Sequence, residues 1–334
     1  MKCSSATMRF VFNPEHDMCL ASGEENFIAP APVQEFARKC RWIEEYMPVP
    51  AEYPFAVAPW GWNSCIRKRL LKEGYPAEEL PSEQYIDFVK EHSRRELSVK
   101  LHNFLYSEFA VDADGLLLPP GYRCIARSVE EVEDALAKWK RVVLKAPLSG
   151  SGKGVRFVSE ALMTTDLGWC RNVIARQGTV MVERREELVK EFAMLFECAD
   201  DVVFAGYSLF YSANGAYRGN VLASNGYIEN VLGGFVPAEH LRKCACLTVQ
   251  FLQERLQGKY RGFVGVDHFF AVGYDSSSGN PCSGDVLWNP AMEINLRTTM
   301  GHVARNIFDS HASSKVLGEG THCFEPERGI VKCG

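Results

Sequence analysis

Three polar side chains alternate with apolar ones in the stretch NPAMEINLRTTMG, residues 289–301. Alternate side chains of a strand share a face, so Glu293, Asn295 and Arg297 point the same way while the apolar residues between them face a core. Carboxylate and amide oxygens suit a hard cation such as Mg²⁺, and a guanidinium matches phosphate oxygens. The row predicts a site for a metal and a phosphate group. The alternative is the solvated polar face of a strand.

A second carboxylate precedes this row. Asp267 lies in GFVGVDHFF, whose alternation indicates another strand, and the Ser- and Gly-rich segment from Asp275 to Gly284 indicates a long hairpin loop between the two strands. If the hairpin closes, Asp267 joins Glu293 as a metal ligand.

A Gly-rich segment, Ser149-Gly150-Ser151-Gly152-Lys153-Gly154, joins the apolar stretches RVVLKAPL and GVRFVS. Its backbone N–H groups can approach an anion closely and form a phosphate nest. Pro147 stands where a P-loop needs its first glycine, the segment is no GxGxxG opening a helix, and the chain has no HRD or DFG of a protein kinase. Lys145 favours an anion, because a lysine in an apolar strand is costly without a partner. The alternative is a hairpin tip that binds nothing.

The elements that must position these residues alternate between helix and strand. Short apolar runs and helical stretches form a βα pattern from Met8 to about Leu97. An amphipathic helix over 128–140, with Ser128 at its N-cap, precedes the Gly-rich hairpin, and alternating strands follow it. This order predicts an α/β fold with an N-terminal βα domain.

The composition argues against several classes of protein. The 334 residues are 46% hydrophobic with a net charge of -5, which argues against nucleic acid as a partner, and no apolar run reaches the roughly 20 residues that span a membrane. The twelve cysteines include no CxxC pair and the eight histidines no HExxH, so we expect free thiols in a reducing, cytoplasmic setting. A homodimer is the default expectation for oligomeric state.

A lysine-bearing strand, a Gly-rich hairpin, a strand ending in an acidic hinge, and then Asp with Glu-x-Asn-x-Arg together resemble the ATP-grasp superfamily, over about Ser98 to Gly301. The resemblance implies an α/β domain at 1–97, then a small lobe (98–182) and a catalytic lobe (183–334) that clasp ATP with Mg²⁺ or Mn²⁺. It implies an ADP-forming ligase that activates a carboxylate as an acyl phosphate for attack by an amine or another nucleophile. Its substrates would be small-molecule or peptide carboxylates and amines.

The resemblance also implies residue roles at the nucleotide. Lys145 and Lys100 would contact its phosphates, and the loop from Ser149 to Gly154 would close over the β- and γ-phosphates. The acids that would meet the nucleoside are Glu183 at the hinge for adenine and Glu191, with Glu187 as its rival, for ribose.

The metal ligands implied in the same way are Asp267, Glu293 and Asn295, and Arg297 would steady the transferred phosphoryl group. A small-molecule kinase on the same lobes is one alternative. A regulatory protein that binds ATP without turnover is another, although the intact Glu, Asn and Arg row argues against it.

Two features of the N-terminal part are open to two interpretations. Asn13 and His16 follow the strand-like MRFVF, and ligands lie at the carboxyl ends of strands in open α/β sheets, so these side chains either touch the acceptor substrate or build a capped turn. Trp60 and Trp62 either wall a pocket or pack in a core.

Overall fold

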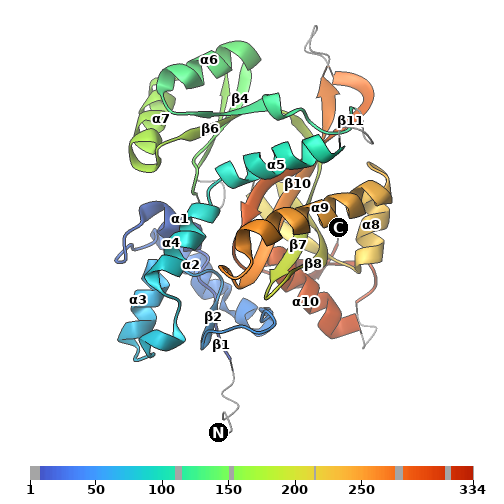
Figure 1. Cartoon of the computed structure of the whole chain (residues 1–334). Coiled ribbons are helices and arrows are strands. Elements are labelled where there is room, and N and C mark those ends of the chain that lie inside the picture. The colour runs from blue at the N-terminus through green and yellow to red at the C-terminus, as the bar shows by residue number, and fades with distance from the viewer. Residues whose placement is uncertain are drawn as a thin grey trace.

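The computed structural model describes residues 8–109, 115–149, 154–213, 216–274, 281–312 and 317–333. Within these ranges the strands form a two-stranded, a four-stranded and a seven-stranded sheet, with helices between and around them (Figure 1). The mixed α/β fold expected from the sequence is confirmed. No helix in these ranges is long and apolar enough to cross a membrane.

The N-terminal part is built on two short parallel strands, β1 (Arg9–Val11) and β2 (Val57–Pro59). Its helices are α1 (His16–Ser22), α2 (Ala31–Lys39), α3 (Ser64–Lys72) and α4 (Glu83–His92), with 3₁₀ turns at Arg41–Tyr46 and Ala77–Glu79. The side chains of Asn63 and Ser82 accept hydrogen bonds from the first turns of α3 and α4, which fixes where these helices begin.

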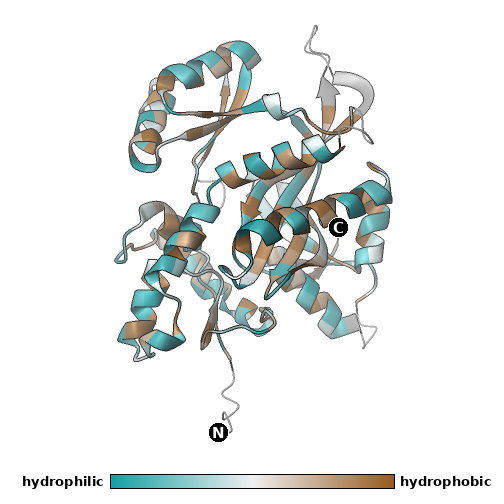
Figure 2. Ribbon diagram, viewed as in Figure 1, coloured by the Kyte–Doolittle hydropathy of each residue, from teal (hydrophilic) through white to brown (hydrophobic). Residues whose placement is uncertain are grey.

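The four-stranded antiparallel sheet has the order β3-β6-β4-β5. Its strands are β3 (Arg123–Ala126), β4 (Arg141–Lys145), β5 (Val155–Ser159) and β6 (Val180–Arg184). Helices α6 (Val129–Trp139) and α7 (Thr164–Gln177) cover one face, and a 3₁₀ turn at Pro120–Tyr122 precedes β3. The strands are largely hydrophobic, whereas the helices carry many hydrophilic residues (Figure 2). The Gly-rich segment connects β4 to β5.

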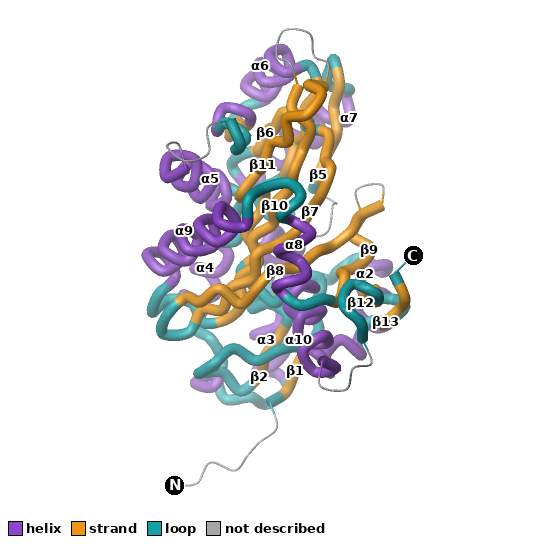
Figure 3. The backbone as a smooth tube through the Cα atoms, turned by 90° about the vertical axis from the view of Figure 1, so that its right-hand side faces the viewer, coloured by secondary structure: helices purple, strands orange, loops and turns teal. Residues whose placement is uncertain are grey.

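The seven-stranded sheet has the order β11-β10-β7-β8-β9-β12-β13. Its strands are β7 (Glu187–Cys198), β8 (Val202–Ala213), β9 (Ala216–Leu222), β10 (Gly262–Tyr274), β11 (Pro281–Asn295), β12 (His322–Glu325) and β13 (Gly329–Lys332). Helices α5 (Glu96–Phe109), α8 (Asn225–Leu232) and α9 (Ala238–Leu256) lie on one side, and α10 (Met300–Ala312) lies on the other (Figure 3). The largest hydrophobic core lies under α5 and α9. The opposite face of β7 and β10 carries Glu191 and Asp267 beside a smaller hydrophobic cluster that includes Phe269 and Ala271.

Helix α5 differs from its expected place. The boundary expected at residue 98 assigns it to the small lobe, but it packs against β11 and α9 of the large sheet. Its buried residues Leu101, Leu105 and Phe109 belong to the same core as Phe192 and Trp288. The hydrophobic face of the helix determines its partner.

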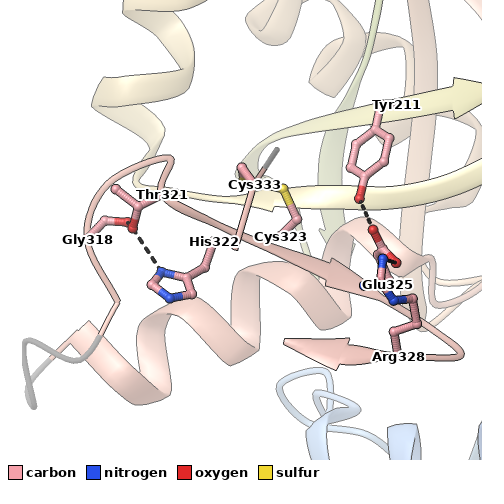
Figure 4. The surroundings of a disulfide bond; sticks show 8 residues. All are labelled: Tyr211, Gly318, Thr321, His322, Cys323, Glu325, Arg328 and Cys333. Atoms are coloured by element: carbon pink, nitrogen blue, oxygen red, sulfur yellow. Dashed lines mark hydrogen bonds and ion pairs between the residues drawn. A yellow bond between two sulfur atoms is a disulfide. The ribbon is translucent and has the colours of Figure 1, made fainter. Parts of the chain in front are cut away.

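One disulfide corrects the expectation of free thiols. Cys323 and Cys333 are bonded across the β12–β13 hairpin, with their Cα atoms 5.4 Å apart (Figure 4). Antiparallel pairing brings the two cysteines together, and nothing in their spacing marked them as partners. Eight further cysteines in the described ranges are free, and five of these are buried.

Candidate active site

Two carboxylates face each other on adjacent strands. Asp267 of β10 lies directly opposite Glu293 of β11, so the long hairpin does bring them together. Asn295 lies on the same face, and its Nδ2 donates to Oδ2 of Asp267 over 3.1 Å. The alternation expected from the sequence therefore holds in the structure, with Ile294 buried on the other side.

The electrostatics of this pair suit a cation. Burial, together with the negative charge of Glu293, raises the pKa of Asp267 to about 7. A divalent ion between the carboxylates would remove the repulsion. Within the described ranges no group of three or more His, Cys, Asp or Glu side chains could hold a metal alone. Mg²⁺ commonly takes one or two protein carboxylates and completes its shell with water and phosphate oxygens, so Asp267, Glu293 and Asn295 fit it.

Arg95 connects these carboxylates to the Gly-rich loop. Its Nη1 lies 2.8 Å from Oε2 of Glu293, its Nε donates to the carbonyl of Ala146 over 3.0 Å, and its Nη2 donates to Oγ of Ser149 over 3.3 Å. The guanidinium is almost fully buried. The sequence interpretation missed Arg95, although its place just before α5 was a usable signal, because a helix start is where anions bind.

Lys100, the predicted second phosphate lysine, is not brought to this site. Its side chain is exposed, and at about 100° per residue it lies about 200° around α5 from Ser98, which contacts β11. Its charge acts instead on His92. Arg95, one and a half turns earlier, occupies the position by the loop.

Lys145 lies at the end of β4, beside Glu183 of β6. Its Nζ is 2.5 Å from Oε2 of Glu183, whose Oε1 lies 3.7 Å from Nη1 of Arg123. All three side chains are buried. Burial raises the pKa of Glu183, but Lys145 and Arg123 outweigh that effect and the pKa is lowered. The carboxylate of Glu183, predicted to meet adenine, is thus turned toward two cations, while Oε1 lacks a hydrogen-bond partner.

The two ends of the Gly-rich loop are held tightly. Ala146 donates its N–H to the carbonyl of Gly154, and the side chain of Gln177 bonds both the N–H and the carbonyl of Leu148. A Cβ on Gly154 would lie 2.1 Å from Cβ of Ser149, so only glycine fits there. The predicted phosphate-binding residues Gly150, Ser151, Gly152 and Lys153 lie outside the described residues.

The two rival ribose acids lie on β7. Glu191 is half-buried and opposite Phe269, on the face that also carries Asp267, and its charge contributes to the raised pKa of Asp267. Burial raises the pKa of Glu191 itself, against opposing effects of Ser212 and Lys145. Glu187 is exposed at the start of the strand. The geometry favours Glu191 as the acid nearer the site.

Arg297 ends the polar row and contacts the N-terminal part. Its Nε and Nη2 donate to the carboxylate of Asp17 over 2.9–3.2 Å, and Nη2 also donates to Oδ1 of Asn295 over 2.8 Å. Its guanidinium lies 6.0 Å from the ring of Trp60. Asp17, in the first turn of α1, was not predicted as a site residue.

Asn13 and His16, predicted as possible substrate contacts, are buried and serve the turn around Gly61. Asn13 exchanges hydrogen bonds with the backbone of Gly61, and a Cβ on Gly61 would meet the His16 ring at 2.6 Å. Asn63 uses its Oδ1 to accept from the N–H of Ile66, so its Nδ2 faces Nδ1 of His16 at 3.2 Å. Burial lowers the pKa of His16 to about 4, which keeps the ring neutral at pH 7.

A polar cleft lies where the three parts meet. It is lined by Asp17 of the N-terminal part, by the loop residues 147–149, and by residues 293–296 of the large sheet. Arg95 contacts both the loop and Glu293 at this cleft. An anion bound there would lie close to Arg95, which contacts Ser149 and Glu293 of the lining.

Comparisons with known proteins found no matching family model and no matching curated protein. Among solved structures, D-alanyl-alanine synthetase A from Vibrio cholerae O1 biovar eltor is similar at 14% identity, over 94% of this chain and 95% of that one, with a TM-score of 0.44. The biotin carboxylase complex from Campylobacter jejuni is similar at 13% identity, over 91% of this chain and 60% of that one, with a TM-score of 0.46.

A third similar structure is the ADP complex of N5-carboxyaminoimidazole ribonucleotide synthetase, at 14% identity over 94% of this chain and 78% of that one, with a TM-score of 0.43. With TM-scores below 0.5, the similarities assign neither an activity nor a ligand to this chain.

Proposed function

We propose that the protein is a Mg²⁺- and ATP-dependent ligase that joins a carboxylate to an amine or another nucleophile and releases ADP and phosphate. The observation that supports this most is the facing pair Asp267 and Glu293, together with Arg95, which contacts both Glu293 and the start of the Gly-rich loop at the polar cleft. Phosphoryl transfer needs positioning and charge neutralisation more than covalent chemistry from the protein, and this arrangement can supply both.

Each group has one task in this proposal. Lys145, Arg95 and the backbone of the Gly-rich loop bind the phosphates of ATP, while Glu191 binds the ribose. Asp267, Glu293 and Asn295 hold Mg²⁺, which neutralises charge on the phosphate oxygens. Arg297 binds the oxyanion of the carboxylate and then the acyl phosphate.

The proposed reaction has two steps. A carboxylate oxygen attacks the γ-phosphorus of ATP, the bond to the bridging oxygen breaks, and ADP leaves. The lone pair of the amine then attacks the carbonyl carbon, phosphate leaves, and the amine loses a proton. An acyl phosphate is hydrolysed readily, so the reaction requires that water be kept from it.

The test is ADP release from the full chain with Mg²⁺ and ATP, screened against pools of carboxylic acids with and without pools of amines. A ligase releases ADP only when an acid and a nucleophile are both present. ADP formation with a single acceptor indicates a kinase, and tight ATP binding without turnover in any pool indicates a regulatory protein. Glu293→Gln should reduce turnover by about 100-fold and nucleotide binding by much less, because the glutamine removes the charge needed by the metal while its oxygen can still accept a hydrogen bond from Arg95.

A further inference from the structure

Two cysteines outside the proposed reaction centre lie on neighbouring helices of the N-terminal part. Cys19 lies in the middle of α1 and is 5% exposed, whereas Cys65 lies in the first turn of α3 and is partly exposed. The two helices pack against each other. Neither thiol has a task in the reaction proposed above.

The start of α3 contacts both ends of α1, which brings Cys65 to the face of α1 that carries Cys19. At the first end, Nδ2 of Asn63 lies 3.2 Å from Nδ1 of His16. At the other end, Sγ of Cys65 donates to the carbonyl of Glu24, 3.1 Å away and two residues beyond the last residue of α1. Cys19 follows His16 by three positions, so both lie on one face of the helix, and Cys19 lies between the two contacts.

The two thiols contact each other directly. The side chain of Cys19 is hydrogen-bonded to that of Cys65. Burial, together with the neighbouring sulfur of Cys65, raises the pKa of the Cys19 thiol, so Cys19 stays protonated at pH 7. Cys65 is the more accessible of the two, and its sulfur is therefore the one that a reagent in solution meets first.

Helix α1 also carries Asp17, two residues before Cys19, and the carboxylate of Asp17 holds the guanidinium of Arg297. A covalent bond from Cys19 to α3 would restrain the helix that positions this carboxylate. The state of the two thiols would thus act on the same helix as the ion pair with Arg297.

We infer that Cys19 and Cys65 form a redox site, at which a low-molecular-weight disulfide converts the two thiols into a disulfide that joins α1 to α3. The inference goes beyond the proposed function, because it needs neither ATP nor Mg²⁺.

The oxidation proceeds by two exchanges of sulfur. The sulfur of Cys65 attacks one sulfur of the reagent, the bond between the reagent's sulfurs breaks, and one reagent thiol leaves a mixed disulfide at Cys65. The sulfur of Cys19 then attacks the sulfur of Cys65, and the second reagent thiol leaves. The two cysteines lose two electrons, the reagent gains them, and the two protons of the cysteine thiols pass to the two reagent thiols.

The experiment treats the full chain with oxidised glutathione at about pH 8, where thiols react readily, and maps disulfides by mass spectrometry of peptides prepared without reduction. We expect a linked pair of peptides that contain Cys19 and Cys65. In Cys19→Ser, glutathione should stay attached to Cys65, because the second sulfur is missing. In Cys65→Ser, Cys19 should carry no glutathione because it is buried. Cys124→Ser removes a partly exposed thiol from β3 of the other lobe and should leave the link intact.

Hydrogen exchange measures the restraint on α1. In the oxidised parent the amides of α1 should exchange at least about 10-fold more slowly than in the reduced parent, because opening of the helix then has to occur against a covalent link. The amides of α6, in the small lobe, should exchange at the same rate in both forms.

Three results would overturn the inference: a stable glutathione adduct at Cys65 of the parent without a link to Cys19, no reaction of Cys65, or a link from either cysteine to a third one. Unchanged exchange of α1 in the linked protein would contradict the restraint on this helix. The peptide map uses the unchanged protein, so it decides the question even if a serine variant fails to fold.

Discussion

Asp17 and Arg297 lie 280 positions apart in the sequence and meet in a two-pronged ion pair, with Nη2 of Arg297 2.9 Å from Oδ2 of Asp17. The pair joins the first helix of the N-terminal part to the polar row at the end of β11. It fixes the plane of the guanidinium, which also reaches Asn295. A substrate oxyanion at Arg297 must therefore bind beside the carboxylate of Asp17 or displace it.

Asp17→Asn should destabilise the fold by about 1–3 kcal/mol, because it removes a charged, two-pronged hydrogen bond from a largely buried arginine. Burial raises the pKa of Asp17, but the charge of Arg297 outweighs it and the pKa is lowered. The stabilisation is thus complete above the ordinary pKa of an aspartate and is lost as pH falls through the lowered value. Chemical denaturation across a series of pH values should show a loss of stability in Asp17→Asn that is largest at pH 7 and shrinks as pH falls below the ordinary pKa of an aspartate.

The matched control for that variant is Asp309→Asn, which breaks an exposed ion pair with Arg305 in α10. Exposed pairs of this kind contribute about 0–1 kcal/mol. Equal destabilisation by the two substitutions at pH 7 would show that the Asp17–Arg297 pair contributes no more to stability than an exposed ion pair does.

Arg95→Met should weaken binding of Mg²⁺ and ATP by at least about 10-fold, since one charged hydrogen bond to phosphate is worth about 1.5–3 kcal/mol. Lys100→Met, a change of similar size five residues further along α5, should leave the affinity within about twofold because Lys100 is exposed. Titration with a fluorescent ATP analogue measures both. The reverse order of effects would restore Lys100 as the phosphate lysine.

Lys145→Met should cost about 3–5 kcal/mol of stability, because it leaves the buried carboxylate of Glu183 with only Arg123, at 3.7 Å. The double variant Lys145→Met/Glu183→Gln should recover much of that stability by removing the uncompensated charge. Neither variant should bind ATP with the parent's affinity. Recovery of ATP affinity together with stability in the double variant would remove Lys145 from the phosphate site.

Asp267 should make stability depend on pH in the absence of Mg²⁺. Its pKa is raised to about 7 by burial and by Glu293, so the folded state holds a proton that the unfolded state has released, and this stabilisation is lost as pH rises toward and through 7. Between pH 5 and pH 8 the free energy of unfolding of the parent should fall by about 1–2 kcal/mol relative to that of Asp267→Asn. The effect is limited because the carboxylate is partly exposed to solvent. Thermal melts across this range measure the difference.

Mg²⁺ should reverse that loss. At pH 8 a millimolar concentration of the ion should raise the melting temperature of the parent and leave that of Asp267→Asn unchanged, because binding requires the ionised pair. A pH-independent difference between the two proteins, or equal stabilisation of both by Mg²⁺, would exclude Asp267 as a ligand.

The polar row was predictable because strand alternation is a local property. Glu293, Asn295 and Arg297 could be placed on one face from their spacing alone, and Asp267 followed from a hairpin between neighbouring strands. Which side of a helix faces its partners depends on contacts between distant segments. The sequence therefore predicted Lys100 at the site, whereas the structure has Arg95 there.

Contacts between distant segments could not be predicted from the sequence either. Nothing near Asp17 in the sequence indicates that it meets Arg297. The spacing of Cys323 and Cys333 does not indicate a bond either, because their approach depends on the pairing of two strands of only four residues each. The position of α5 depends on distant contacts in the same way, because its apolar residues pack in the core of the large sheet.

Transfer of oxygen from the acid to phosphate tests the central claim most directly. An acid that supports ADP release would be labelled with ¹⁸O in its carboxylate and turned over with Mg²⁺, ATP and the amine. An acyl phosphate predicts that one labelled oxygen appears in the inorganic phosphate, because the carboxylate oxygen attacks phosphorus and leaves with it. Formation of the amide product with no label in the inorganic phosphate would contradict activation of the carboxylate by phosphoryl transfer at this site.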